Sequence, residues 1–195
     1  GGGVLAIALG ATGIPADVES RTIYPLIARP LTRAQYVIGK FLGTFLTVAL
    51  GVLAMSAVLG ALIYSYQRSF DSFLPMAMLF TLLEVAVVAA LATAVSTVAT
   101  PAVTAVLTFL IYVCGTVKIG YFGPLIQRSS DGLLRTAYTL VYHALPNLEC
   151  FNLKDALVHH DLVPPDYLVL VGLYGLCYMA FVLFLGSLYF SRKEV

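Results

Sequence analysis

The apolar positions of the chain form long unbroken blocks instead of alternating with polar ones. The blocks Phe41–Gln67 and Tyr167–Ser191 contain no charged residue, and the longer block Ser72–Val117 contains only Glu84. A helix rises about 1.5 Å per residue, so about 20 apolar residues cross the roughly 30 Å of hydrocarbon in a bilayer. The first two blocks therefore predict one membrane span each, at 41–66 and 167–190, and the third is long enough for two.

The third block is expected to reverse near Thr97–Pro101, because proline opens a helix readily and fits poorly inside one. This gives predicted spans at 73–100 and 101–117. The block Gly1–Ala16 is shorter and has no Met, no basic segment and no cleavage-site pattern, so it does not read as a signal peptide. We expect it to be the second half of a hydrophobic segment, in a natural protein that is longer at its N-terminus. The pattern predicts an all-α polytopic membrane bundle of about five spans in a single transmembrane domain, 1–195.

Composition agrees with this fold class and excludes others. The chain is 60% hydrophobic and 11% charged, whereas a soluble domain carries about 25% charge. A net charge of +1 argues against nucleic acid as a partner, because binding polyphosphate requires clustered, uncompensated basic residues. The three cysteines have no C-x-x-C spacing, which argues against a zinc framework. No phosphate-binding loop or hydrolase motif is present, so we expect no enzyme activity, cofactor or metal in this chain.

Basic residues predict the orientation, since cytoplasmic loops are enriched in Lys and Arg. They gather in the segment Asp17–Lys40 and in the tail 191–195, namely Arg21, Arg29, Arg33, Lys40, Arg192 and Lys193. With five spans these two segments lie on one side, which we assign to the cytoplasm. The loop 118–166 is then extracytoplasmic. It is expected to form two short amphipathic helices, the first ended by Pro146 and the second at Leu153–His160, that lie on the outer membrane surface or cap the bundle.

The segment Asp17–Lys40 is also the densest polar cluster of the chain. Pro25 and Pro30 divide it into short pieces, and Arg29 and Arg33 are four residues apart. Short, charged, rigid helices at a membrane face can transmit force to a docked partner. The same composition also fits an ordinary basic loop that only anchors the bundle, and the pattern alone leaves both interpretations open.

The run VESRTIYPLIARPLTRAQYVIGKFLG at Val18–Gly43 resembles the signature of type-two ABC permeases, the membrane subunits of ABC exporters. LPNLECFNLKDALV at Leu145–Val158 and the ending FSRKEV at Phe190–Val195 are also similar to that family. The resemblance implies six spans with both termini in the cytoplasm, so that roughly the first span is missing here. It also implies that Val18–Ala28 and its neighbours form coupling helices that dock on a separate ATPase. The implied coupling residues are Glu19, Arg21, Thr22, Leu26, Arg29, Pro30, Arg33, Tyr36 and Lys40.

The same resemblance implies the partners and the location. A separate ABC ATPase subunit would bind ATP and Mg, and a second permease copy would complete a homo- or heterodimer. The chain would lie in the lipid bilayer of a bacterial plasma membrane, with its C-terminus in the cytoplasm. The function expected is therefore that of the permease subunit of an ATP-driven exporter. An ion-coupled secondary transporter that uses Glu84, and a membrane scaffold that transports nothing, are the alternatives.

Glu84 is costly in an apolar span, about 2.5–3.5 kcal/mol on insertion scales, so it should face protein or water. It and Lys118 are equally far along the chain from Pro101, so a hairpin centred there would bring them level. Glu84 is either a carboxylate of the substrate path or gate, or a structural partner of Lys118. These two residues are the predicted intramembrane polar site.

The remaining candidates are weaker. Histidines and a carboxylate occur in the outer loop, at His143, His159, His160 and Asp161. Adjacent histidines on a helix point about 100° apart and seldom share one ion, so we interpret these residues as solvated loop positions in preference to a metal site. A disulfide bridge between Cys114 and Cys150 is one interpretation of the cysteines, and buried free thiols are the one we favour. Small residues at helical spacing suit close helix contacts within one subunit or across a dimer; they are Gly43, Thr47 and Gly51 in one span and Ala86, Ala90 and Ala94 in the next.

Overall fold

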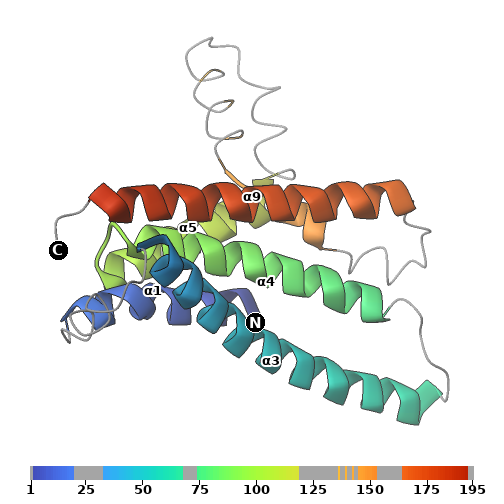
Figure 1. Cartoon of the computed structure of the whole chain (residues 1–195). Helices are drawn as coiled ribbons and strands as arrows, with labels where there is room; N and C mark the ends of the chain where they lie inside the picture. The colour runs from blue at the N-terminus through green and yellow to red at the C-terminus, as the bar shows by residue number, and fades with distance from the viewer. Residues whose placement is uncertain are drawn as a thin grey trace.

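A computed structural model describes residues 2–19, 33–67, 74–118, 136, 139, 142, 145–152 and 164–192 of the chain. Within these ranges the secondary structure is helical, which confirms the predicted all-α fold class. The α-helices are α1 (Gly2–Glu19), α3 (Arg33–Gln67), α4 (Leu74–Ser96), α5 (Pro101–Thr116) and α9 (Pro165–Arg192), and the short 3-10 helix η2 covers Glu149–Phe151 (Figure 1).

Helix α4 is the centre of the bundle. It packs against α1, α3, α5 and α9, and η2 also contacts it. Every residue from Val85 to Thr93 is buried, which means that this stretch is covered on all faces by the other helices. A helix that is apolar all round and buried all round is typical of such a central position.

Among the described residues, three helices are long and apolar enough to cross a bilayer, at Ala34–Tyr66, Pro75–Ser96 and Asp166–Phe190. Helix α5 has 16 residues, so it extends about 24 Å and falls short of the roughly 30 Å of hydrocarbon. The apolar part of α1, Gly2–Ala11, is shorter still. The described part of the bundle therefore combines three long apolar helices with two whose apolar stretches are short.

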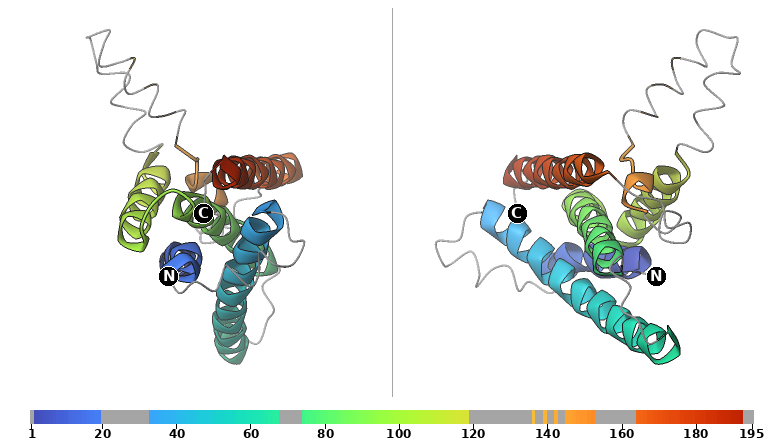
Figure 2. Two further views of the ribbon diagram at one scale, coloured as in Figure 1. Left: turned by 60° about the vertical axis from the view of Figure 1, so that its left-hand side comes forward. Right: turned by 90° about the vertical axis from the view of Figure 1, so that its right-hand side faces the viewer.

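Helix α3 leaves the bundle along its length (Figure 2). Near its start, Val37 and Phe41 are buried, but from Leu53 to Tyr66 every residue is exposed or only partly buried. The large side chains there face outward, with Leu62 58% and Tyr66 94% exposed. The second half of α3 thus has little contact with the described remainder of the chain.

The helices define two ends of the bundle. We call one the Pro101 end, because it holds the turn between α4 and α5, in which Thr97 and Val98 bond to the carbonyls of Ala94 and Val95. Helix α9 ends there too, since a Cβ on Gly186 would lie 3.1 Å from Ala94. The opposite end, where α5 ends and α4 and α9 begin, is the Lys118 end.

Candidate functional site

The predicted coupling segment lies between α1 and α3, and the structure describes only its two edges. Glu19 is the last residue of α1 and Arg33 is the first of α3. Arg21, Thr22, Leu26, Arg29 and Pro30 lie outside the described residues, so their coupling role stays a prediction. Tyr36 and Lys40 lie on the first turns of α3.

The start of α3 is attached to the end of α9. The rings of Tyr36 and Phe190 stack with centroids 5.8 Å apart. Val37 is fully buried beside Phe190, which is 6% exposed. At the same end of the bundle α1 approaches α4 closely, because a Cβ on Gly10 would lie 2.6 Å from the Cβ of Ala92. Both helices that flank the coupling segment are therefore packed firmly on the bundle at the Pro101 end.

Glu84 of α4 lies opposite Tyr112 of α5, whose Oη donates a hydrogen bond of 3.3 Å to Oε1 of the carboxylate. The predicted level pairing of Glu84 with Lys118 assumed a hairpin centred on Pro101. In the structure α4 already ends at Ser96 and α5 begins at Pro101, so the centre of the hairpin moves toward the N-terminus. The register then brings Tyr112 level with Glu84, and Lys118 lies further along the chain.

Lys118 is buried, with 6% of its surface exposed. Its Nζ donates a hydrogen bond of 2.8 Å to the carbonyl of Leu145, and lies 4.4 Å from the centre of the Tyr142 ring. Burial lowers the pKa of Lys118, because a low-dielectric site disfavours the charged amine. Lys118 and Glu84 both act electrostatically on the thiol of Cys150, so the two charges lie in one neighbourhood. A direct contact between them stays a prediction.

The segment Leu145–Asn152, which includes η2, passes between α5 and α9. Its residues Leu148 and Phe151 are buried, at 0% and 2% exposure. The two amphipathic helices predicted on either side of it, the second at Leu153–His160, lie outside the described residues apart from helical positions 136, 139 and 142, so their place on the outer surface or as a cap of the bundle stays a prediction. The structure places Phe151 against Gly175, where an added Cβ would lie 3.0 Å from the ring. Gly175 lies about 15 Å along α9 from Pro165, so the segment enters the bundle instead of lying on its surface.

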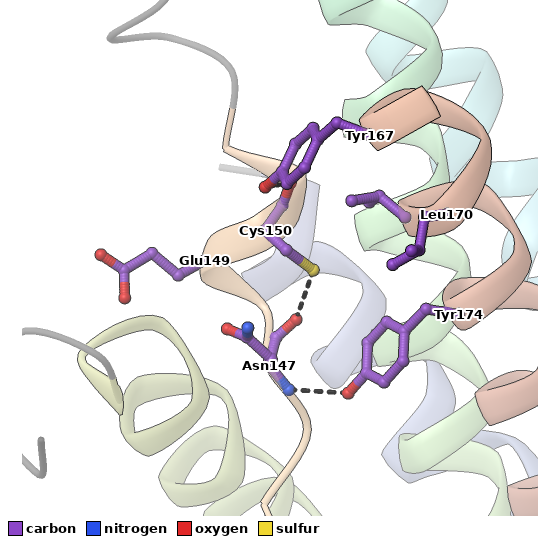
Figure 3. A pocket seen from close by; sticks show the side chains of 7 residues that line it. Asn147, Glu149, Cys150, Tyr167, Leu170 and Tyr174 are labelled. Carbon is purple, nitrogen blue, oxygen red and sulfur yellow. Dashed lines mark hydrogen bonds between the residues drawn. The ribbon is translucent and has the colours of Figure 1, made fainter. Parts of the chain in front are cut away.

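A pocket of about 450 Å³ opens between this segment and α9 (Figure 3). Its lining includes Cys150, Tyr167, Leu170 and Tyr174. The thiol of Cys150 donates to the carbonyl of Asn147 at 2.8 Å. Burial raises the pKa of Cys150 to about 11, since the thiolate would lose its hydration. The thiol is therefore protonated at neutral pH and unreactive while the segment stays in place.

The predicted helix-packing residues have two different environments. Ala86 and Ala90 are buried in the centre of α4, and Ala94 is partly buried against Gly186 of α9. On α3, a Cβ added to Gly43 or Gly51 would meet nothing within 4 Å. Thr47 is exposed and donates to the carbonyl of Gly43. Within the described residues, the α4 set serves contacts inside the subunit and the α3 set lies against no neighbouring helix.

One polar feature was missed at the sequence level. Thr104 and Thr108 are fully buried on α5, and Thr108 Oγ1 has no hydrogen-bond partner among the described residues. Thr104, Thr108, Tyr112 and Thr116 recur every four residues and so share one helix face. That spacing is visible in the sequence and could have identified a polar stripe on α5.

The last candidates are the outer histidines and the cysteines. His143, His159, His160 and Asp161 lie outside the described residues. No cluster of three potential metal ligands occurs in the part of the chain that the structure covers. Cys114, Cys150 and Cys177 are all free thiols, so the predicted alternative of a bridge between Cys114 and Cys150 is absent here.

Comparison with known proteins identifies the family to which the chain belongs. No curated protein sequence matches the chain at the required significance. A family model described as ABC-2 family transporter protein matches residues 2–147. The match spans most of the chain, from α1 through α5 to the entry of the segment Leu145–Asn152. The chain is thus a multi-pass membrane protein that belongs to the ABC-2 family of transporter proteins.

Proposed function

We propose that this chain is the permease subunit of an ATP-driven ABC exporter in a bacterial plasma membrane. The observation that carries the proposal is the ABC-2 family match over residues 2–147. A separate ABC ATPase would bind ATP and Mg, and this chain would do no covalent chemistry. A second permease copy, identical or related, would complete the transporter.

The arrangement of the helices supports this coupling role. Force applied to the segment between α1 and α3 would reach α4, because both helices pack on it. It would also reach α9 through the stacked rings of Tyr36 and Phe190. We therefore assign the Pro101 end, with the basic segment Asp17–Lys40 and the C-terminus, to the cytoplasm. The Lys118 end then faces outward.

Co-purification tests the proposal. The tagged chain should bring down a soluble ATPase with Walker motifs, and reversal of both charges, Arg29→Glu with Arg33→Glu, should release it. A matched control is Tyr66→Phe, far away at the exposed end of α3. A chain that binds no ATPase but moves solute down an ion gradient would overturn the proposal in favour of an ion-coupled carrier. Retention of the ATPase by the double variant would refute the docking assignment.

A further inference from the structure

A further pocket, with a volume of about 530 Å³, lies at the Pro101 end of the bundle. We call it the slot. The last turns of α4 form its floor, and α5 and α9 form its sides (Figure 1). Its lining includes Leu91 and Val95 of α4, Leu107 of α5, and Val182, Gly186 and Tyr189 of α9. The volume lies within the range of about 300–1,000 Å³ that is usual for ligand sites.

The lining of the slot is almost wholly apolar. None of the lining residues that the structure describes is charged. The hydroxyl of Thr97, which also lines the slot, donates to the carbonyl of Ala94 at 2.7 Å. The slot therefore offers its occupant apolar contacts along its length and one phenol at its end, that of Tyr189. Such a lining accepts a hydrocarbon chain and excludes a charged group, which would lose its hydration without gaining a partner.

The slot opens to the side of the bundle, where a bilayer meets a multi-pass membrane protein. The lining residues that are exposed are Val98, Leu107, Leu185 and Tyr189. From Val182 to Tyr189 the slot runs about 10 Å along α9, most of the roughly 15 Å that one leaflet contributes to the hydrocarbon. It thus matches an acyl chain in length as well as in chemistry. Because an unfilled gap deprives its walls of dispersion contacts, a chain from the adjacent leaflet stabilises the bundle by entering it.

The face of α9 that lines the slot ends in a positive charge. Val182, Gly186 and Tyr189 follow one another at helical spacing, and Arg192 occupies the next position on that face, one turn beyond Tyr189. Arg192 is also the first charged residue after the block Tyr167–Ser191. Tyrosine is typical of the boundary between hydrocarbon and head groups, and basic residues just beyond that boundary attract anionic lipids. The head group of a lipid whose chain fills the slot would therefore lie level with Tyr189 and Arg192.

We propose that the slot binds one acyl chain of an anionic phospholipid from the leaflet on the Pro101 side, and that Tyr189 and Arg192 recognise its head group. The chain fills the gap between α5 and α9 over the last turns of α4, and the phosphate pairs with the guanidinium. The inference goes beyond the exporter function and does not depend on it, because it needs only the membrane location that the family implies. A lipid that binds only the folded chain also raises its stability by mass action.

Quenching of tryptophan fluorescence by brominated lipids tests the proposal, because the sequence contains no tryptophan. Leu107→Trp places one reporter on the side of the slot. The purified chain is reconstituted in phosphatidylcholine vesicles that contain increasing fractions of chain-brominated phosphatidylglycerol or, in parallel, of chain-brominated phosphatidylcholine. Half-maximal quenching should need about fivefold less of the anionic lipid, the factor expected from one basic side chain at the membrane surface.

Two outcomes of this titration would overturn the proposal. Equal quenching by the two lipids would mean that the slot has no preference for an anionic head group. A reporter that neither lipid quenches would mean that protein, such as a second copy of the chain, covers the slot.

Two second-site changes in the reporter chain locate the lipid. Val95→Phe enlarges a side chain on the floor of the slot, so the preference for the anionic lipid should disappear. Val58→Phe is the matched control, because it makes the same change on the exposed half of α3, and it should preserve the preference. A preference that survives Val95→Phe would place the lipid elsewhere on the surface, against the proposal.

Arg192 is tested without altering the slot, which keeps the proposal open to refutation even where Val95→Phe does not fold. Arg192→Gln should remove most of the fivefold preference, and Arg192→Lys, which keeps the charge, should retain most of it. High salt should weaken the preference of the reporter chain, because ions screen the attraction between the guanidinium and the phosphate. An undiminished preference in Arg192→Gln would refute the assignment of the head-group site.

Discussion

Tyr112 of α5 donates its hydroxyl hydrogen to the carboxylate of Glu84 on α4, over 3.3 Å. The bond joins the two arms of the hairpin that turns between Ser96 and Pro101. Tyr112 also lies against α1, because a Cβ on Gly3 would come within 2.7 Å of its ring. The only acidic residue of the apolar block 72–117 is therefore held by a partner that three helices position.

We expect Tyr112→Phe to lower the free energy of unfolding by about 1 kcal/mol, because the carboxylate loses a donor while the ring still fills its site. Thermal unfolding in detergent measures the change. The control Tyr66→Phe, at a 94% exposed position, should leave the midpoint unchanged. Equal midpoints for the two variants would show that the bond contributes nothing.

Glu84→Gln distinguishes a structural carboxylate from a functional one. The amide keeps an acceptor for Tyr112, so we expect transport by the reconstituted complex to be retained with a small loss of stability. A loss of transport at unchanged stability would instead place Glu84 in the substrate path or gate.

The sequence predicts the fold class well, because apolar blocks of membrane length leave little choice of structure. It also predicts that α5 opens at Pro101 and that Glu84 needs a partner. It cannot predict Tyr112 as that partner. The residues between Ser96 and Pro101 form a turn and not a helix, so the residue of α5 that lies level with Glu84 changes from the expected Lys118 to Tyr112, which is more than one helical turn earlier. Nor does it predict that the segment Leu145–Asn152 enters the bundle, because the contacts of Leu148 and Phe151 depend on glycines far away in the chain.

A further prediction concerns the close helix packing at Gly10. An added methyl would lie 2.6 Å from the Cβ of Ala92 on the central helix, so Gly10→Ala should cost about 1–3 kcal/mol through overpacking. The matched change Gly43→Ala adds a methyl where nothing lies within 4 Å. It should leave stability unchanged or raise it by up to about 1 kcal/mol, because alanine favours helix over glycine. Thermal midpoints of both variants in detergent test this contrast.

The opposite ranking would be informative. If Gly43→Ala is the more damaging variant, the exposed face of α3 contacts another molecule in the assembly, and comparison of detergent with lipid nanodiscs would identify that contact as a second permease copy or lipid.

The pH dependence of alkylation at Cys150 follows from its burial. Burial raises the pKa of Cys150 to about 11 from its ordinary value of 9.0, so the thiolate fraction of the folded protein at pH 8 should be about a hundredfold lower than in the unfolded chain. In a variant with Cys114→Ala and Cys177→Ala, which leaves Cys150 as the thiol that reacts, the rate of alkylation by iodoacetamide should be half-maximal near pH 11 in the folded protein. In denaturant it should be half-maximal near pH 9. A folded-state rate that is half-maximal near pH 9 would mean that the thiol of Cys150 is not buried.

The contact of Phe151 with Gly175 supplies a final, quantitative prediction. A Cβ on Gly175 would lie 3.0 Å from the ring of Phe151, so Gly175→Ala should destabilise the protein because a buried ring must move. The penalty should shrink in a Phe151→Leu background, since the shorter side chain leaves room for the methyl. A double-mutant cycle of unfolding free energies should then give a coupling above about 0.5 kcal/mol, the limit expected for independent sites. Additive effects would mean that Phe151 and Gly175 do not touch, and that the segment Leu145–Asn152 does not reach the middle of α9.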